Sequence, residues 1–326
     1  MKIEKHGTKY RVRKMYKGTV YLLSFDKLPD EKDISIAFAE KLKEEGTIEK
    51  GSFEDFALKY IKNRKNVTSP STERTYNIKL KQLSDGFKQK SLSEITAEDV
   101  QVEINNLAGR YEPKTVHTAH GFIASVLGEY RPNLKLRTKL PQKIRKEQYE
   151  PTNEDIKRIL DRVKGGKYDV AFQLGVLGCR VAEICAFTLD DLDDNNLRIH
   201  KNMVMNTNGQ WVIKETPKTD ESNRTLPLPK SLATKIKKQG FIYDGHPNAL
   251  NRAMHRYQKE LGIPQFRFYD LRHYFASYAH SKNIPDADIM AIGGWKTDHV
   301  MKRVYRNSIE ESKKKSMSIL TKGLIK

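Results

Sequence analysis

Residues 171–184 read AFQLGVLGCRVAEI, a mainly apolar run up to Gly178 that is followed within five residues by Arg180 and Glu183. The apolar part is typical of a helix buried in a core, and the glycine after it marks the end of that helix. An arginine in this place is either the structural partner of a nearby acid, here Glu183, or a fixed cation that binds an anion. Segments further along the chain bear on this choice.

Three later segments also place cationic or aromatic side chains at turns or helix starts. They are Thr216-Pro217-Lys218-Thr219, Tyr269-Asp270-Leu271-Arg272-His273 and Gly293-Gly294-Trp295, and Tyr305 follows the last of them by ten residues. The chain has no Gly-x-x-x-x-Gly-Lys phosphate loop, no His-Glu-x-x-His and no Gly-x-Ser-x-Gly. Nucleotide hydrolysis, zinc catalysis and serine hydrolase chemistry are therefore disfavoured.

The composition indicates a folded protein with a polyanionic partner. The 326 residues carry a formal net charge of +19, with 31% charged and 37% hydrophobic residues. No stretch approaches the roughly 18 to 20 apolar residues of a spanning helix, and the first residues show no apolar signal region. Nucleic acid is thus favoured over membrane as the partner, and we expect the protein to act in the cytoplasm. Cys179 and Cys185 are too few for a disulfide framework or a zinc site, so we expect reduced core residues.

The pattern along the chain predicts a mainly helical, multidomain α+β protein. Residues 1–48 alternate apolar and polar side chains, turn near Lys17-Gly18, alternate again, and then show a helical pattern from Pro29-Asp30 to Gly46. This favours a small β-sheet with one helix. Residues 49–138 have helical spacing, and we expect four helices, the third of which starts at Thr96.

A basic, proline-containing stretch from Arg131 to Lys146 follows, and we assign residues 139–150 to a linker, because proline interrupts helices and like charges repel. Residues 151–326 contain all of the segments quoted above. There we expect Thr152 to cap a helix, strands at 197–199, 211–214 and 225–228, and helices after Ser231.

Taken in order, the quoted segments resemble the catalytic domain of tyrosine recombinases, the phage integrase family. The pattern of that family is Gly-Leu-Arg-x-x-Glu, a hairpin lysine in a Thr-Lys-Thr-like context, His-x-Leu-Arg-His, Gly-His/Trp and a final tyrosine. The match runs from about Thr152 to the end of the chain. Residues 1–48 and 49–138 are similar to the family's arm-binding domain and to its helical, SAM-like core-binding domain. Each motif alone is weak, but the ordered set is specific.

The resemblance implies an enzyme that cleaves and rejoins DNA through a 3′-phosphotyrosine intermediate, without metal or cofactor, to integrate or excise a mobile element. Tyr305 is then the nucleophile, and it needs cations because the ordinary pKa of tyrosine is about 10. Arg180 and Arg272 would stabilise charge on the nonbridging phosphate oxygens. Lys218 would protonate the 5′ oxygen that leaves, and Trp295 would donate its indole N–H to a phosphate oxygen.

Two positions depart from the family pattern. Tyr269 stands where the family usually has a histidine, and a phenol is a poor base near neutral pH. The proton of Tyr305 would then be accepted by water, by His273 or by the phosphate itself. Cys179 replaces the usual leucine, which we interpret as a change of packing only.

Simpler interpretations of the same side chains stay open. We expect Glu183 to be a structural acid that orients its neighbours, and His273 to be either a donor near the phosphate or a capping or core histidine. The alternative for Lys218 is a solvated lysine in a turn. Tyr274 and Tyr278 have the helical spacing of core residues, whereas Tyr305 follows a polar turn.

Double-stranded DNA attachment sites of core and arm type are the expected partners, bound by a homotetramer, with excision or host DNA-bending factors as further candidates. By the resemblance, the apolar tail from Met317 to Ile325 docks on a neighbouring protomer. Tyr10, Tyr16 and Tyr21 are expected on the same strand face as basic residues that contact DNA. The expected DNA-binding residues are Lys9, Arg11, Arg13, Lys14, Lys17, Lys143, Arg145 and Lys146.

Two competing functions remain. A relaxase similar to type IB topoisomerases shares the tyrosine, arginine and lysine set, and it would yield relaxed circles without joined recombinants. A DNA-binding regulator with an inactive recombinase fold is suggested by Tyr269 alone. The presence of Tyr305, Lys218 and both arginines argues against the regulator.

Overall fold

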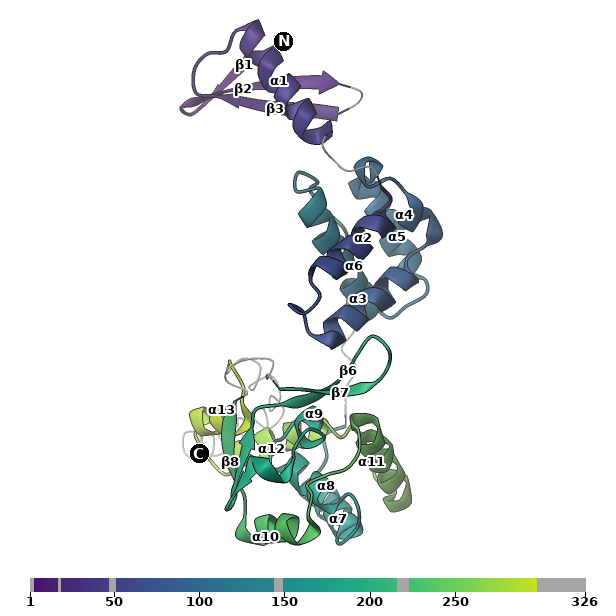
Figure 1. Cartoon of the computed structure of the whole chain (residues 1–326), viewed down its shortest axis with the longest axis vertical. Coiled ribbons are helices and arrows are strands. Elements are labelled where there is room, and N and C mark those ends of the chain that lie inside the picture. The colour runs from purple at the N-terminus through teal and green to yellow at the C-terminus, as the bar shows by residue number, and fades with distance from the viewer. Residues whose placement is uncertain (1–2, 17–18, 47–50, 144–148, 216–222, 298–326) are drawn as a thin grey trace, which may run out of the picture. The chain divides into compact units, whose positions relative to one another are not determined.

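The computed structural model describes residues 3–16, 19–46, 51–143, 149–215 and 223–297 (Figure 1). The chain divides into two compact units. The first comprises Met1–Thr68 and Thr75–Ile144, and the second comprises Ser69–Arg74 and Arg145–Lys326. The mainly helical α+β class predicted from the sequence is confirmed.

The N-terminal part of the first unit is a three-stranded antiparallel sheet with one helix. Its strands, in the order β1-β2-β3, are β1 (Ile3–His6), β2 (Lys9–Tyr16) and β3 (Thr19–Phe25), and its helix is α1 (Glu31–Gly46). The helix runs along the sheet in Figure 1, and the core between them contains Val12, Tyr21, Leu23, Ile34 and Phe38. The β2–β3 hairpin matches the alternation in the sequence, and α1 matches the helical pattern that follows it. The sequence pattern missed β1, whose four residues are all exposed.

The helical part of the first unit has a core of its own. Its helices are α2 (Phe53–Asn63), the part of α3 (Pro70–Gln82) from Thr75 onward, α4 (Asp85–Gln89), η1 (Leu92–Glu94), α5 (Ala97–Ala108) and α6 (Pro113–Tyr130). The side chain of Thr96 accepts a hydrogen bond from the backbone N–H of Asp99, and the carboxylate of Asp99 accepts one from Thr96 in return. This capping box is the reason that α5 begins where the sequence predicted. The short helices α4 and η1 were not predicted.

The contacts of residues 131–143 revise the start of the predicted linker. The backbone N–H of Lys139 donates to Gln101 Oε1 at 2.7 Å, and His117 Nε2 donates to Pro141 O at 2.9 Å. Leucines 134, 136 and 140 pack on the helical core, while the basic residues between them are exposed. Charge and proline suggested a bare linker, but alternate leucines attach this extended stretch to the helices, and the first unit continues to Ile144.

The second unit combines helices with two small antiparallel sheets. Its helices are α7 (Asn153–Val163), α8 (Asp169–Val176), α9 (Val181–Ile184), η2 (Leu189–Asp191), α10 (Lys230–Gln239), α11 (Pro247–Leu261), α12 (Asp270–Ser281) and α13 (Asp286–Gly293). One sheet has the order β4 (Leu192–Asp193), β5 (Asn196–Ile199) and β8 (Arg224–Pro227), and the other pairs β6 (Asn202–Met205) with β7 (Trp211–Lys214). Thr152 caps α7 as predicted, and the three predicted strands are present; β4 and β6 were missed.

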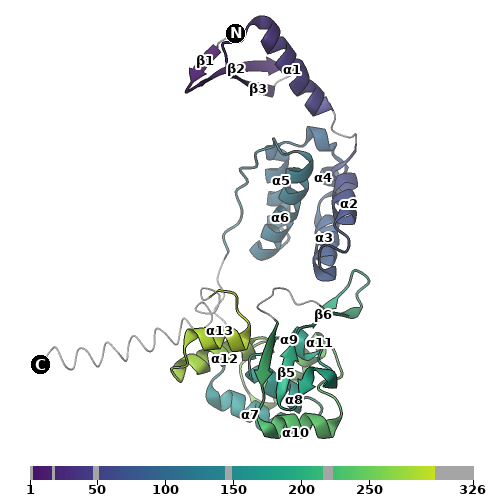
Figure 2. The same ribbon diagram turned by 60° about the vertical axis from the view of Figure 1, so that its left-hand side comes forward.

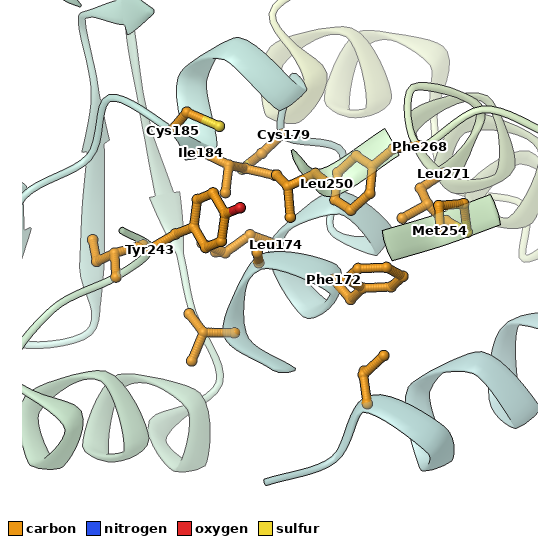
Figure 3. Packing of buried hydrophobic residues seen from close by; sticks show 14 of the residues in the cluster. Phe172, Leu174, Cys179, Ile184, Cys185, Tyr243, Leu250, Met254, Phe268 and Leu271 are labelled. Carbon is orange, nitrogen blue, oxygen red and sulfur yellow. The ribbon is translucent and has the colours of Figure 1, made fainter. Parts of the chain in front are cut away.

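Helix α8 lies at the centre of the second unit. Figure 3 shows Phe172 and Leu174 of this helix among Leu250, Phe268 and other apolar side chains. The rings of Phe172 and Phe268 meet edge to face, with centroids 5.0 Å apart. A Cβ atom on Gly175 would lie 2.8 Å from a methyl group of Leu271, so α8 and α12 are in close contact there. Arg180, which comes after α8 in the chain, and Arg272, which lies in α12, are therefore held by a tightly packed core.

Cys179 and Cys185 are both buried and unpaired, and burial raises the pKa of each thiol to about 12. They are reduced core residues, as predicted.

Helices α12 and α13 lie side by side in both views (Figures 1 and 2) and contact each other. Among the described helices, none has the length and apolar character needed to cross a membrane.

We predict that Phe172→Ala lowers the free energy of unfolding of the second unit by about 3–5 kcal/mol, because it leaves a cavity in the core. The matched control is Phe241→Ala, because Phe241 is 42% exposed, and its expected cost is below about 1 kcal/mol. Urea denaturation followed by circular dichroism measures both. Equal losses for the two variants would contradict this account of the core.

Candidate active site

Three arginines from three different parts of the second unit bind the carbonyl groups where α13 ends. The hydrogen bonds are Arg224 Nε to Ile292 O at 2.7 Å, Arg272 Nη1 to Gly293 O, and Arg180 Nη2 to Gly294 O at 2.7 Å. Carbonyl groups in the last turn of a helix lack partners within the helix and carry partial negative charge, which suits a guanidinium. The turn before Trp295 is thereby tied to the start of α9, to β8 and to α12.

One buried carboxylate, that of Glu183, joins two of these arginines. Arg180 donates to it from Nη1 at 2.5 Å and from its backbone N–H at 2.8 Å, and Arg224 donates from Nη1 and Nη2 at 3.2 and 3.0 Å. Burial alone would raise the pKa of Glu183, but Arg224 and Arg180 hold that pKa below its ordinary value. These contacts fit the prediction that Glu183 is an ionised structural acid that orients its neighbours.

Arg272 is 1% exposed, yet only part of its guanidinium is bound. Its Nη1 donates to Gly178 O at 2.7 Å and to Gly293 O, while Nε and Nη2 have no hydrogen-bond partner among the described residues. Burial, followed by repulsion from Arg180, lowers the pKa of Arg272 to about 10, so the side chain stays charged at neutral pH. Buried donors without partners lower the stability of the fold. The edge of the guanidinium formed by Nε and Nη2 is therefore suited to bind two oxygens of an anion.

The indole of Trp295 covers one face of this guanidinium. The ring centroid lies 3.8 Å from Cζ of Arg272, a cation–π contact, and the indole stacks on Phe275 with the two rings 8° apart. Two glycines make room for these rings. A Cβ on Gly178, which has φ +90°, would lie 2.8 Å from the Phe275 ring, and one on Gly293 would lie 1.9 Å from the Trp295 ring.

Tyr269 and His273 lie at the start of α12. Tyr269 is 36% exposed, and its ring meets that of His273 edge to face at 5.1 Å. Burial lowers the pKa of His273, so its imidazole is neutral at pH 7, and its buried Nδ1 has no partner among the described residues. Tyr278, expected in the core, is instead 41% exposed and stacks on Tyr274; the helical spacing was correct, but this face of α12 is not covered within the described part of the chain.

Comparison with known proteins identifies the family. Residues 152–312 match the model described as the phage integrase family, and residues 52–108 match the model of the phage integrase N-terminal SAM-like domain. The chain belongs to the phage integrase family. It is 23% identical over 206 residues to a XerC-like tyrosine recombinase of Caldanaerobacter subterraneus subsp. tengcongensis, in a match that covers 52% of this chain and 53% of the relative. The chain thus spans about half the length of that relative.

Solved structures of integrases share the fold. The Tn1549 transposon integrase in complex with transposon right end DNA matches with a TM-score of 0.63 at 17% identity, over 81% of this chain and 99% of that chain. A lambda integrase dimer bound to a COC′ core site matches with a TM-score of 0.58 at 15% identity, over 93% of this chain and 94% of that chain. The family resemblance stated from the sequence is confirmed.

Within this phage integrase family member, the structure brings together four of the predicted site residues, Arg180, Glu183, Arg272 and Trp295. Tyr269, directly before α12, and His273, within α12, lie near Arg272. The predictions for Lys218 and Tyr305 lie outside the described residues, as do those for Lys17, Arg145, Lys146 and the apolar tail. No group of three or more His, Cys, Asp or Glu among the described residues could hold a metal ion.

Sequence reasoning missed Arg224. It stands first in β8, directly before a predicted strand, and its side chain is 7% exposed. The sequence showed only that Arg224 begins a strand in which Leu226 is buried. This position does not distinguish Arg224 from the other residues among the 60 lysines and arginines of the chain. Its partners, Glu183 and Ile292, are far away in the sequence.

The predicted DNA-binding set divides between the two faces of the N-terminal sheet. Lys9, Arg11 and Arg13 are exposed and alternate along β2, and Lys143 of the second basic stretch is also exposed. Lys14 was assigned to the same face wrongly: its Nζ lies 4.1 Å from the Phe38 ring centre on the side of α1. Strand periodicity explains the correction, because successive side chains point to opposite faces. Tyr16 and Tyr21 likewise contact Phe38 rather than joining the arginines.

We predict that Gly293→Ala displaces the indole of Trp295, because the added Cβ would overlap the ring. In a Trp211→Phe background, which leaves Trp295 as the only tryptophan, fluorescence emission should shift to longer wavelength. Gly121→Ala is the matched control, since a Cβ at Gly121 meets nothing within 4 Å. Unchanged emission in the Gly293 variant would show that the close packing of Trp295 is not required.

Proposed function

We propose that this protein is a site-specific recombinase that cleaves and rejoins DNA through a covalent bond between Tyr305 and a DNA phosphate. The observation that supports this most strongly is the unpaired edge of Arg272, which is buried and charged beside Arg180. Two fixed guanidiniums are suited to the charge that builds on the nonbridging oxygens during attack on a phosphodiester.

In the proposed reaction, the hydroxyl oxygen of Tyr305 attacks the phosphorus, and the bond from phosphorus to the 5′ oxygen breaks. The proton of Tyr305 passes to water, to the phosphate or to His273, and Lys218 gives a proton to the leaving 5′ oxygen. A 5′-hydroxyl of another strand then attacks the phosphotyrosine and restores the diester. The covalent link conserves the energy of the broken bond, so the cycle needs no ATP.

The side chains around Arg272 have complementary roles in this proposal. Nε and Nη2 of Arg272 bind two phosphate oxygens, and Nη1 remains on the carbonyl groups that hold it in place. Trp295 shields the guanidinium from water, which strengthens its attraction for the phosphate. His273 is neutral at pH 7, so it can accept a proton, whereas the Tyr269 hydroxyl serves as a hydrogen-bond donor.

We further propose that the enzyme integrates or excises a mobile element as a tetramer on DNA. Residues 1–48 would bind arm-type sites through the face that carries Lys9, Arg11 and Arg13, residues 49–138 would bind core sites, and residues 151–326 would cleave them. The related lambda integrase is described as a tetramer bound to a Holliday junction, and the Tn1549 integrase as bound to transposon DNA. The N-terminal sheet supports a mobile-element role over chromosome dimer resolution.

The test is trapping on a nicked suicide duplex, made with sequences that the protein selects from random duplex DNA. The short fragment below the nick diffuses away after cleavage, so we expect a covalent adduct on a denaturing gel, which Tyr305→Phe abolishes. Tyr278→Phe, at an exposed tyrosine, is the matched control and should retain the adduct.

Specific DNA binding without an adduct over pH 5.5–9 would instead favour a regulator with an inactive recombinase fold. An adduct that yields relaxed circles and no joined recombinants would favour a relaxase.

A further inference from the structure

We infer that Arg224 is a positioning residue for DNA cleavage, which acts by binding both oxygens of Glu183 and the Ile292 carbonyl and thereby sets the guanidinium of Arg180. The inference rests on the proposed function, because it concerns the rate at which that same site reacts. Neither the family pattern quoted above nor the sequence pattern assigns a role to this arginine.

The guanidinium of Arg224 is directed entirely at the protein. All three of its nitrogens donate to Glu183 or to Ile292 O, at distances of 2.7 to 3.2 Å. The side chains of Arg224 and Glu183 are only 7% and 5% exposed. Arg272, in contrast, leaves two nitrogens without partners among the described residues. Arg272 is thus placed to touch a substrate, and Arg224 is placed to act through other side chains.

Arg224 changes how strongly Glu183 competes for Arg180. Glu183 accepts hydrogen bonds from both arginines, and a carboxylate that is already paired with Arg224 offers less attraction to Arg180. The ionised cluster of three arginines and one glutamate has a net charge of +2. Without Arg224 the net charge falls to +1, just where a phosphate gains negative charge during attack. The loss should therefore slow cleavage more than it weakens DNA binding.

Arg224 also keeps Glu183 ionised. The groups that face Glu183 are Arg180, Arg224, Arg272 and the neutral thiol of Cys179. Burial raises the pKa of Glu183, and Arg224 is the strongest of the groups that lower it. When Arg224 loses its charge, the pKa of Glu183 rises, and Glu183 becomes protonated as the pH falls. A protonated Glu183 no longer holds the guanidinium of Arg180 through an ion pair, so Arg180 loses its fixed position. This loss of orientation outweighs the one unit of positive charge that the cluster regains, so cleavage by such a variant should decline toward acid pH.

The experiment measures single-turnover adduct formation at saturating DNA from pH 5.5 to 8.5. We expect Arg224→Gln to react about 10- to 100-fold more slowly at pH 7, the loss typical of a buried hydrogen bond to a charged group, with DNA affinity within about twofold. Its rate should fall further toward acid pH, and this extra fall should vanish in the double variant with Glu183→Gln. Arg162→Gln, which breaks a surface ion pair with Glu260, is the matched control.

Arg224→Lys separates positioning from mere folding. Lysine keeps the charge, so no acid decline is expected, but it lacks the planar fork and should react several-fold more slowly than the wild type. If the wild type forms no adduct, the proposed function fails. If the wild type reacts and Arg224→Gln matches it in rate and pH profile, the role of Arg224 is refuted. Equal slowing by both Arg224 variants with unchanged pH profiles would likewise refute it.

Discussion

The hydrogen bonds from three guanidiniums to three successive carbonyl groups at the end of α13 are the constraint on which the candidate site depends. They join α9, β8 and α12 to the turn that carries Trp295, and Glu183 compensates part of the charge that they bring together. Like charges repel when brought close, so this cluster requires those carbonyl groups and that carboxylate to be in place. In return, the cations are fixed before any substrate arrives, which is the arrangement that stabilises developing charge most effectively.

The packing beneath the cluster explains why it can be held so firmly. Helix α8 brings the backbone of Gly175 against α12, and the loop after α8 gives Gly178, whose carbonyl binds Arg272. Glycine is required at Gly178 and Gly293 because the rings of Phe275 and Trp295 occupy the space of a side chain there. The apolar core, the two close glycine contacts and the charged site are therefore parts of one packed structure.

Much of this could be predicted from the sequence, where local signals were strong. Capping residues such as Thr96 and Thr152, apolar periodicity and alternation located most helices and strands, and the ordered motifs located Arg180, Glu183, Arg272 and Trp295. The misses have physical causes. The partners of Arg224 are distant in the chain, and the leucines among the basic residues at 131–143 find their partners only in the folded helical module. Lys14 is different, because alternation along β2 already places it on the face opposite Lys9, Arg11 and Arg13.

The most direct test of the account is a crystal structure of the Tyr305→Phe protein bound to an intact duplex that it selects. We predict that Nε and Nη2 of Arg272 lie within hydrogen-bond distance of one phosphate, while Nη1 remains on Gly178 O and Gly293 O. Arg180 should contact the same phosphate with its bond to Glu183 intact. A phosphate held by other side chains, or an Arg272 that has left the carbonyl groups to reach it, would contradict the claim that this cluster is built in advance for phosphate.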